Sequence, residues 1–252
     1  MSPTFGQPIA RTLTRWFRFR LKTLLLIVLL VSIICGWVRD RHLLHQAREI
    51  GRIRIEIYSD PHTFANRLRR AVRVVDFDDI DTELTDIAPF KSNRYQSQGL
   101  IIEGADGQYV GQTFFQPRDF TAASQPNAYA PGPVGKNPGG NSTDVTFLDG
   151  KSRGLVSGFG LNFIDVDFSM IQPSGLELYD RYGNLLATYN SIVGPNRTPV
   201  FCGIVAVDPG GNPIPVIARV KLTNGTGWPG IDSGETVTMD DFTFAIPAPF
   251  PK

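Results

Sequence analysis

The sequence contains little cysteine and little histidine, and each shortage excludes a class of chemistry. Cys35 and Cys202 are the two cysteines among 252 residues, and Cys35 falls within an apolar run, so no disulfide can form inside the region that follows. The three histidines, His42, His45 and His62, all precede residue 72. The region beyond has no histidine to act as a general base or metal ligand. Because it also has no disulfide, its fold must rest on a core or on bound metal.

Basic residues are scarce in the second part of the chain. Residues 1–75 carry 14 Lys and Arg against 4 Asp and Glu, whereas residues 76–252 carry 11 against 20. An acidic surface repels phosphates, so we expect no nucleic acid among the partners of the globular part. The basic N-terminal part suits contact with lipid headgroups instead.

A long apolar run occurs near the N-terminus. Residues 23–38, TLLLIVLLVSIICGWV, are uncharged and follow the basic positions Arg11, Arg15, Arg18, Arg20 and Lys22. The run is near the lower limit for a hydrocarbon core of about 30 Å, and no A-x-A-like cleavage site follows it. The sequence predicts a basic cytoplasmic tail over 1–20 and an uncleaved span over 21–38, rather than a cleaved signal peptide. The protein is then a single-pass protein of the cell membrane whose partner is the lipid bilayer, with its C-terminal domain outside the cytoplasm.

Residues 39–71 are charged and poorly periodic, and we expect them to form a stalk. Within it, Asp60 and Pro61 supply a helix cap and a first-turn proline ahead of HTFANRLRRAV. A short helix ending near Val72 is therefore predicted.

From Val72 the pattern changes to short alternating runs separated by Gly, Pro, Asn and Asp. Residues 214–222 are the clearest example, with Val220 and Leu222 on one face and Arg219 and Lys221 on the other. This pattern predicts an all-β domain over 72–248, an antiparallel β-sandwich, followed by a tail at 249–252.

Two of the expected strands lose their alternation at a pair of acidic residues. In GFGLNFIDVDF the apolar positions change parity before Asp165 and Asp167, and in TVTMDDFTF they do so across Asp240 and Asp241. Each change of parity predicts a β-bulge, which redirects side chains.

Several segments of residues 72–248 together resemble a known family: VVDFDDID, GLIIEGADGQYVG, GFGLNFIDVDF, LELYDRYGNLLATY, FCGIVAVD and VTMDDFTFAIP. They are similar to exported bacterial β-sandwich domains related to the galactose-binding-like or carbohydrate-binding-module jelly rolls. The resemblance implies a jelly roll whose first and last strands hold a structural calcium ion, and the matching positions are Asp76, Asp78, Asp240 and Asp241. Short carboxylates suit calcium, although aspartates also cap turns and solvate strand edges. Asp165 and Asp167 form a weaker second metal candidate.

A carbohydrate site needs an aromatic ring beside polar groups. Trp228 lies in the loop NGTGWPG with Asn224 nearby, and Tyr129 lies in the Pro- and Gly-rich stretch 116–142. These three are the candidate ligand-binding residues. Trp228 could instead plug the end of the sandwich, and Tyr129 could instead fix the loop.

Three function classes remain open. The first is a membrane-anchored extracytoplasmic binding module for carbohydrate, with a glycan or envelope polymer as partner. The second is a structural or adhesive envelope protein without a small ligand. A hydrolase would need paired carboxylates such as Glu103 and Glu177, and no motif places them together, so we expect no enzyme activity.

Overall fold

The computed structural model describes residues 27–28, 30–32, 34, 52–69, 71–82, 87–105, 107–112, 123–124, 127–131, 142–164, 166, 174–195, 198–225 and 237–250. The chain divides into two compact units, Met1–Arg52 and Ile53–Lys252. In the first unit the described residues between 27 and 34 are helical and exposed, and the hydroxyl of Ser32 donates to the carbonyl of Val28 at 2.8 Å. Within the described residues, no helix has the length and hydropathy of a membrane span. The tail at 1–20 and most of the span expected at 21–38 lie outside them.

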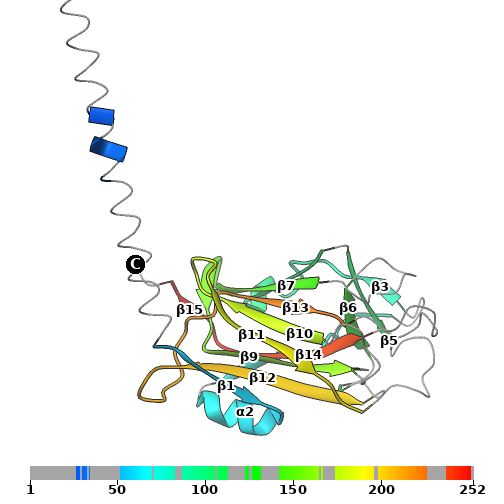
Figure 1. Cartoon of the computed structure of the whole chain (residues 1–252). Coiled ribbons are helices and arrows are strands. Elements are labelled where there is room, and N and C mark those ends of the chain that lie inside the picture. The colour runs from blue at the N-terminus through cyan, green and yellow to red at the C-terminus, as the bar shows by residue number, and fades with distance from the viewer. Residues whose placement is uncertain are drawn as a thin grey trace, which may run out of the picture. The chain divides into compact units, whose positions relative to one another are not determined.

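The second unit is mostly β-structure, as the sequence predicts. One antiparallel sheet runs in the order β1 (Arg54–Tyr58), β12 (Pro199–Val207), β9 (Gly158–Ile164), β14 (Thr238–Ala245), β6 (Asn127–Pro131), β5 (Gln108–Gln112), β3 (Ile87–Pro89), and β2 (Val72–Val75) also pairs with β14. The other runs β11 (Leu185–Ile192), β10 (Ser174–Tyr179), β13 (Arg219–Thr223), β7 (Ser142–Asp149), β8 (Ser152–Leu155), β15 (Ala248–Pro249), and β4 (Leu100–Gly104) also pairs with β7. Figure 1 shows both sheets, and a short 3-10 helix (Gln96–Gln98) precedes β4.

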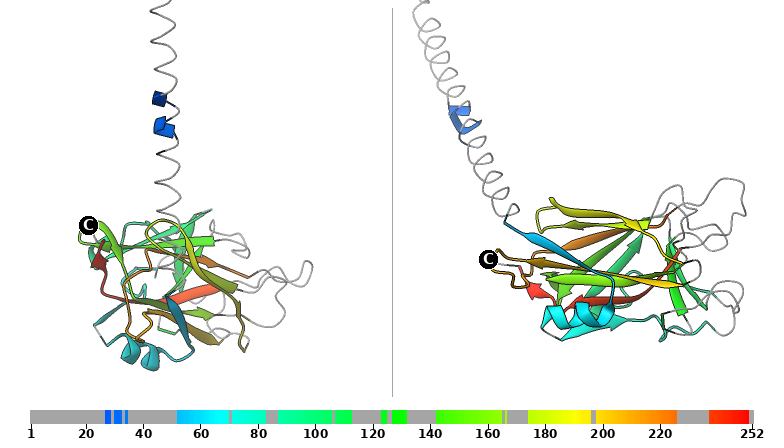
Figure 2. Two further views of the ribbon diagram at one scale, coloured as in Figure 1. Left: turned by 60° about the vertical axis from the view of Figure 1, so that its left-hand side comes forward. Right: turned by 60° about the horizontal axis from the view of Figure 1, so that its bottom comes forward.

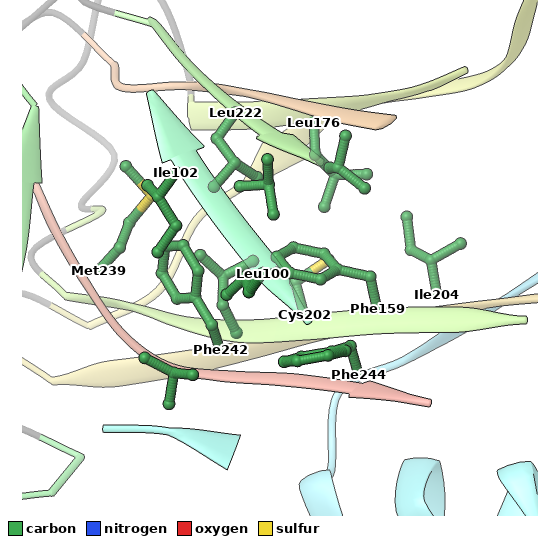
Figure 3. Close-up of a cluster of buried hydrophobic side chains, with 14 of the residues drawn as sticks. Leu100, Ile102, Phe159, Leu176, Cys202, Ile204, Leu222, Met239, Phe242 and Phe244 are labelled. Carbon is green, nitrogen blue, oxygen red and sulfur yellow. The ribbon is translucent and has the colours of Figure 1, made fainter. Parts of the chain in front are cut away.

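The core lies between the two sheets, in a sandwich-like arrangement. In β9, Phe159, Leu161 and Phe163 alternate with residues of the outer face and are fully buried. Figure 3 shows Leu100, Leu176 and Leu222 from one sheet meeting Phe159, Phe242 and Phe244 from the other. The apolar alternation that predicted strands therefore places one face of each sheet in a shared core.

The strand expected at 214–222 is shorter in the structure. β13 begins at Arg219, and before it Ile217 rather than Val216 is fully buried. Ile217 forms an isolated bridge with Val156 instead of a continuous ladder. The expected alternation holds within β13, where Val220 and Leu222 are buried and Arg219 and Lys221 are only partly buried.

The short helix expected after Asp60 is present as α2 (Pro61–Leu68). The Asp60 carboxylate accepts a hydrogen bond from the Thr63 amide at 2.6 Å, and Pro61 occupies the first turn. The helix ends at Arg69, whose φ of 51° is left-handed. Its boundaries thus follow from local capping chemistry.

Helix α2 packs on the outer side of the sheet that contains β12 and β9 (Figures 1 and 2). Phe64 and Leu68 are buried there above two glycines. A Cβ at Gly203 would lie 2.6 Å from Phe64 Cδ2, and one at Gly158 would lie 2.7 Å from Leu68 Cδ2. The glycines therefore allow the helix to approach the sheet closely.

Residues 53–69 belong to the compact unit, although the sequence places them in the stalk at 39–71. β1 pairs with β12 along its whole length, from Arg54 opposite Val207 to Tyr58 opposite Gly203. The reason is visible in RIRIEIY, where Ile53, Ile55 and Ile57 alternate with charged residues as in an edge strand.

An ion pair between Glu56 and Arg67, the Glu56–Arg67 clamp, joins β1 to α2. Arg67 Nε lies 2.6 Å from Glu56 Oε2, and its Nη2 donates to Glu56 Oε1 at 3.2 Å and to the Gly211 carbonyl at 2.6 Å. Tyr58 donates to Glu56 Oε2 at 2.8 Å. The hydrogen bond from Arg67 and those from Tyr58 and Arg54 lower the pKa of Glu56 to about 2.

Candidate acidic metal site

The site begins with a bulge in the middle of β14. Asp240 pairs with Asn162 of β9, and Thr243 pairs with Gly160, so β14 contains one residue more than β9 between these pairs. Asp241 sits in this bulge with a left-handed φ of 50°. The bulge that the sequence predicts at Asp240 and Asp241 is therefore present.

The opening and closing segments of the predicted domain are neighbours. β2 pairs with β14 directly after the bulge, with Val75 opposite Phe242 and Val72 opposite Ala245. The chain that continues from Val75 brings Asp76 beside the bulge, because the Ser124 hydroxyl lies 3.5 Å from the Asp76 carbonyl and 3.1 Å from Asp240 Oδ2. The expected proximity of these two strands is confirmed.

Asp240 is the most deeply buried carboxylate of the group, with 0% of its surface exposed. Its Oδ2 accepts from the Ser124 amide at 2.9 Å and from the Ser124 hydroxyl at 3.1 Å, and its Oδ1 accepts from the Asp241 amide at 2.8 Å. Burial nevertheless raises the pKa of Asp240 to about 8, with a further contribution from the charge of Asp241. Hydrogen bonds alone do not compensate the buried charge.

Asp241 and Asp78 are the partly buried members of the group. Asp241 Oδ2 accepts from the Asn162 amide side chain at 3.1 Å, and Asp78 Oδ1 accepts from the Asn127 backbone amide at 3.0 Å. Burial is the largest cause that raises the pKa of each carboxyl, and the neighbouring Asp76 adds to it. The carboxylates are thus held near one another although they repel.

Asp76 lies at the exposed side. Its Oδ1 accepts from the Asp78 amide at 3.3 Å, and its backbone carbonyl accepts from the Ser124 hydroxyl at 3.5 Å. We call Asp76, Asp78, Ser124, Asp240 and Asp241 the acidic cluster. The ion pairs of the described residues join Arg54, Arg67, Arg94 and Arg219 to acids outside this cluster.

The donors of the acidic cluster are carboxylate, hydroxyl and carbonyl oxygens, which suit a hard cation such as calcium. Among the described residues, no group of three or more His, Cys, Asp or Glu side chains is placed so that it could hold a metal ion. Binding would therefore require the carboxylates to move closer together and the hydroxyl and carbonyl oxygens to contribute.

Two of the three residues that the sequence suggests for carbohydrate binding lie in the interior of the protein. Tyr129 is fully buried, its ring is stacked on Phe77 at 5.6 Å between centroids, and its hydroxyl is 3.1 Å from the Thr143 hydroxyl. Asn224 is also fully buried, and its Nδ2 donates to the Val237 carbonyl at 2.8 Å. Neither side chain offers a surface to a sugar in this structure. Trp228 lies outside the described residues.

The other acidic candidates are apart from the cluster or outside the described residues. Asp165 and Asp167 are outside. Glu177 and Glu103 share one face of their sheet, in a row that runs Glu177, Lys221, Asp144, Glu103 across β10, β13, β7 and β4. Three strand spacings separate the backbones of the two glutamates by about 14 Å, and Lys221 and Asp144 lie between them in this row.

Sequence reasoning missed Ser124 and Asn162. Asn162 occupies the outward position of β9 opposite Asp240, a position that alternation identifies once the pairing is known. Ser124 lies within the stretch 116–142, where no periodic pattern marks a contact with β14.

No protein family model, curated protein or solved structure matches this chain. The interpretation therefore rests on its own residues and on a mostly β fold with two antiparallel sheets.

Proposed function

We propose that the chain is a membrane-anchored extracytoplasmic binding module for carbohydrate, whose jelly-roll sandwich is stabilised by calcium at the acidic cluster. The apolar run at 23–38 behind a basic segment supports the anchor and the orientation. The fold with two antiparallel sheets supports a display domain. The resemblance of its strand segments to carbohydrate-binding jelly rolls supports the ligand class.

The observation that carries the calcium part is the convergence of carboxylates on the bulge of β14. Asp240 is fully buried next to Asp241, and Asp76 and Asp78 follow β2, where the Ser124 hydroxyl lies within 3.5 Å of both the Asp76 carbonyl and Asp240 Oδ2. A divalent cation would replace their mutual repulsion with attraction and would lower the pKa of Asp240 from about 8. Calcium tolerates irregular sets of 6–8 oxygen ligands, which a bulge and a loop serine can supply.

One specific observation favours the second candidate, a structural or adhesive envelope protein. Tyr129 and Asn224 serve the core rather than a surface. The carbohydrate proposal then depends on Trp228, whose loop follows Asn224 directly. Both functions use the same calcium-stabilised domain.

The calcium proposal is tested by melting the full chain in detergent with EDTA and with added calcium. At a calcium concentration of 100 times Kd, linkage adds about 2.7 kcal/mol, which is on the order of 5–10 °C for a domain of this size. Asp240→Asn should abolish the increase, and Asp149→Asn, at an exposed hairpin, should retain it. Equal melting temperatures with EDTA and with calcium would contradict the proposal.

The carbohydrate proposal is tested by glycan-array binding of the same chain and its Trp228→Ala variant. We expect the variant to lose binding at least tenfold while its calcium-dependent melting is unchanged, since an aromatic ring that stacks on a sugar supplies contact area. No binding by the parent chain in calcium would favour the structural role. A lower melting temperature of the variant would show that Trp228 instead packs against the end of the sandwich.

A further inference from the structure

The edges of the two sheets are protected in different ways. β1, at one edge, carries the charged residues Arg54 and Glu56, and β3 at the other edge of that sheet has only three residues. In the second sheet, the free side of β4 is covered, because Ile102 donates to the Ser92 carbonyl at 3.1 Å and Leu100 to the Tyr95 carbonyl at 3.2 Å. Charge, shortness and cover are the usual protections of sheet edges.

Over its eight residues β11 carries no charge, and no described strand covers its outer side, although its pairing with β10 shifts register between Ser174 and Leu176 and between Leu178 and Tyr179. Its sequence, LLATYNSI, contains no charged residue and no proline, and among the described strands it pairs with β10 alone. Leu185, Thr188, Asn190 and Ser191 are exposed. The free backbone side of β11 is therefore a template for another strand.

We propose that β11 pairs antiparallel with β11 of a second copy of this chain. The sheet that contains β11 in one copy then continues into the same sheet of the other copy across a twofold axis. An uncharged strand can lie beside its own copy without repulsion. Leu185 at one end of β11 is 51% exposed, and Val193 just beyond the other end is 38% exposed. Antiparallel pairing brings Leu185 of each copy towards Val193 of the other, so both apolar side chains are covered in the same step.

The pairing is weak in solution and becomes stronger where copies are concentrated. One strand of eight residues spans about 27 Å, and such a contact lies at the low end of interface sizes. Confinement on one surface raises the effective concentration of the copies. The pairing itself does not depend on the proposed function, because it rests on β11 alone.

The experiment is disulfide trapping in cells that express the full chain, in a Cys35→Ser background. Single cysteines replace Thr188, Tyr189 or Asn190 on β11, and Ser152→Cys, at an exposed position of β8, is the control. Directly opposed residues of antiparallel strands lie about 4.5–5.5 Å apart between Cα atoms, within the range of a disulfide. Cys202 is buried, and burial raises the pKa of its thiol to about 12, so it does not compete.

We expect a disulfide-linked dimer at one of the β11 positions at a yield at least fivefold above that of Ser152→Cys. Adding Ser191→Lys to the best cysteine variant should reduce this yield at least threefold, because a charged side chain on an edge strand opposes pairing with another strand. Yields equal to the control at all three positions would overturn the proposal. A cross-linked product with the mass of the chain plus a different protein would also overturn it, since the occupant would then not be a second copy.

Discussion

The Glu56–Arg67 clamp and the acidic cluster place the same functional group in opposite surroundings. In the clamp, Arg67 donates two hydrogen bonds to Glu56, and the pKa of that carboxyl falls to about 2. In the cluster, Asp240 is buried beside Asp241 and its pKa rises to about 8. The clamp supplies its own counter-charge, whereas the ion pairs of the described residues lie outside the cluster. This difference separates a structural ion pair from a candidate ligand site.

The two regions also act at different places in the fold. The clamp holds β1 and α2 on the sheet, since Arg67 also donates to Gly211 in the turn after β12. The cluster lies where β2 meets β14, and Ser124 brings a third segment to it. A change in the clamp should therefore loosen one edge, and a change in the cluster should affect the middle of the sheet.

The largest expected effect is the pH dependence of the cluster in metal-free protein. A folded pKa near 8 against an ordinary value of 3.8 means that the folded state binds more protons between these values. Stability is then fully present below pH 4 and is lost as pH rises towards 8, by up to about 5 kcal/mol. Denaturant unfolding in EDTA between pH 4 and 8 measures this loss.

Asp240→Asn should remove most of that slope, because the amide does not titrate. Saturating calcium should also flatten it in the parent chain by keeping the carboxylate ionised. A stability in EDTA that stays constant from pH 4 to 8 would show that the burial of Asp240 is relieved in solution.

The bulge in β14 could be predicted from the sequence because the parity of apolar positions is a local signal, whereas the proximity of β2 and β14 is implied by the resemblance. Val237 and Met239 precede Asp240 on alternate positions, and Phe242 and Phe244 follow with the opposite parity. One extra residue is the direct cause of such a change. The resemblance then placed Asp76 and Asp78 near the same strand.

The remaining parts of the site could not be predicted because they depend on contacts between distant segments. Ser124 reaches Asp240 across 116 positions of the chain. The Pro and Gly residues around Tyr129 predict a loop, yet Tyr129 lies in β6, where all five residues are buried. Local composition predicted a loop there, and burial in the core overrides it.

The next largest effect is the loss of stability when the clamp is broken, which is measured by comparing Arg67→Ala with Arg94→Ala. Arg67 has 19% of its side chain exposed, whereas the pair Arg94 and Asp79 is 40% and 55% exposed. Loss of Arg67 leaves Glu56 without its main partner and should lower the free energy of unfolding by about 2 kcal/mol. Arg94→Ala should lower it by at most about 0.5 kcal/mol, because exposed pairs are screened by water. Urea unfolding at pH 7 distinguishes the two, and equal losses would contradict the distinction.

The smallest effect is the acid sensitivity of the clamp. The pKa of Glu56 falls from an ordinary value of 4.5 to about 2, so the unfolded state binds more protons between these values. The stability that Glu56 contributes is present above pH 4.5 and is lost as pH falls towards 2, in the opposite direction to the slope of the cluster. Partial exposure of Glu56 limits the loss to about 1–2 kcal/mol.

Denaturant unfolding between pH 5 and 2 measures this loss. The free energy of unfolding should decline less steeply for Glu56→Gln than for the parent chain, whereas Glu103→Gln, at an exposed position of β4, should decline as the parent does. A decline in Glu56→Gln as steep as that of the parent would mean that Arg67 does not hold Glu56 in solution, and the contrast between the two regions would then rest on the cluster alone.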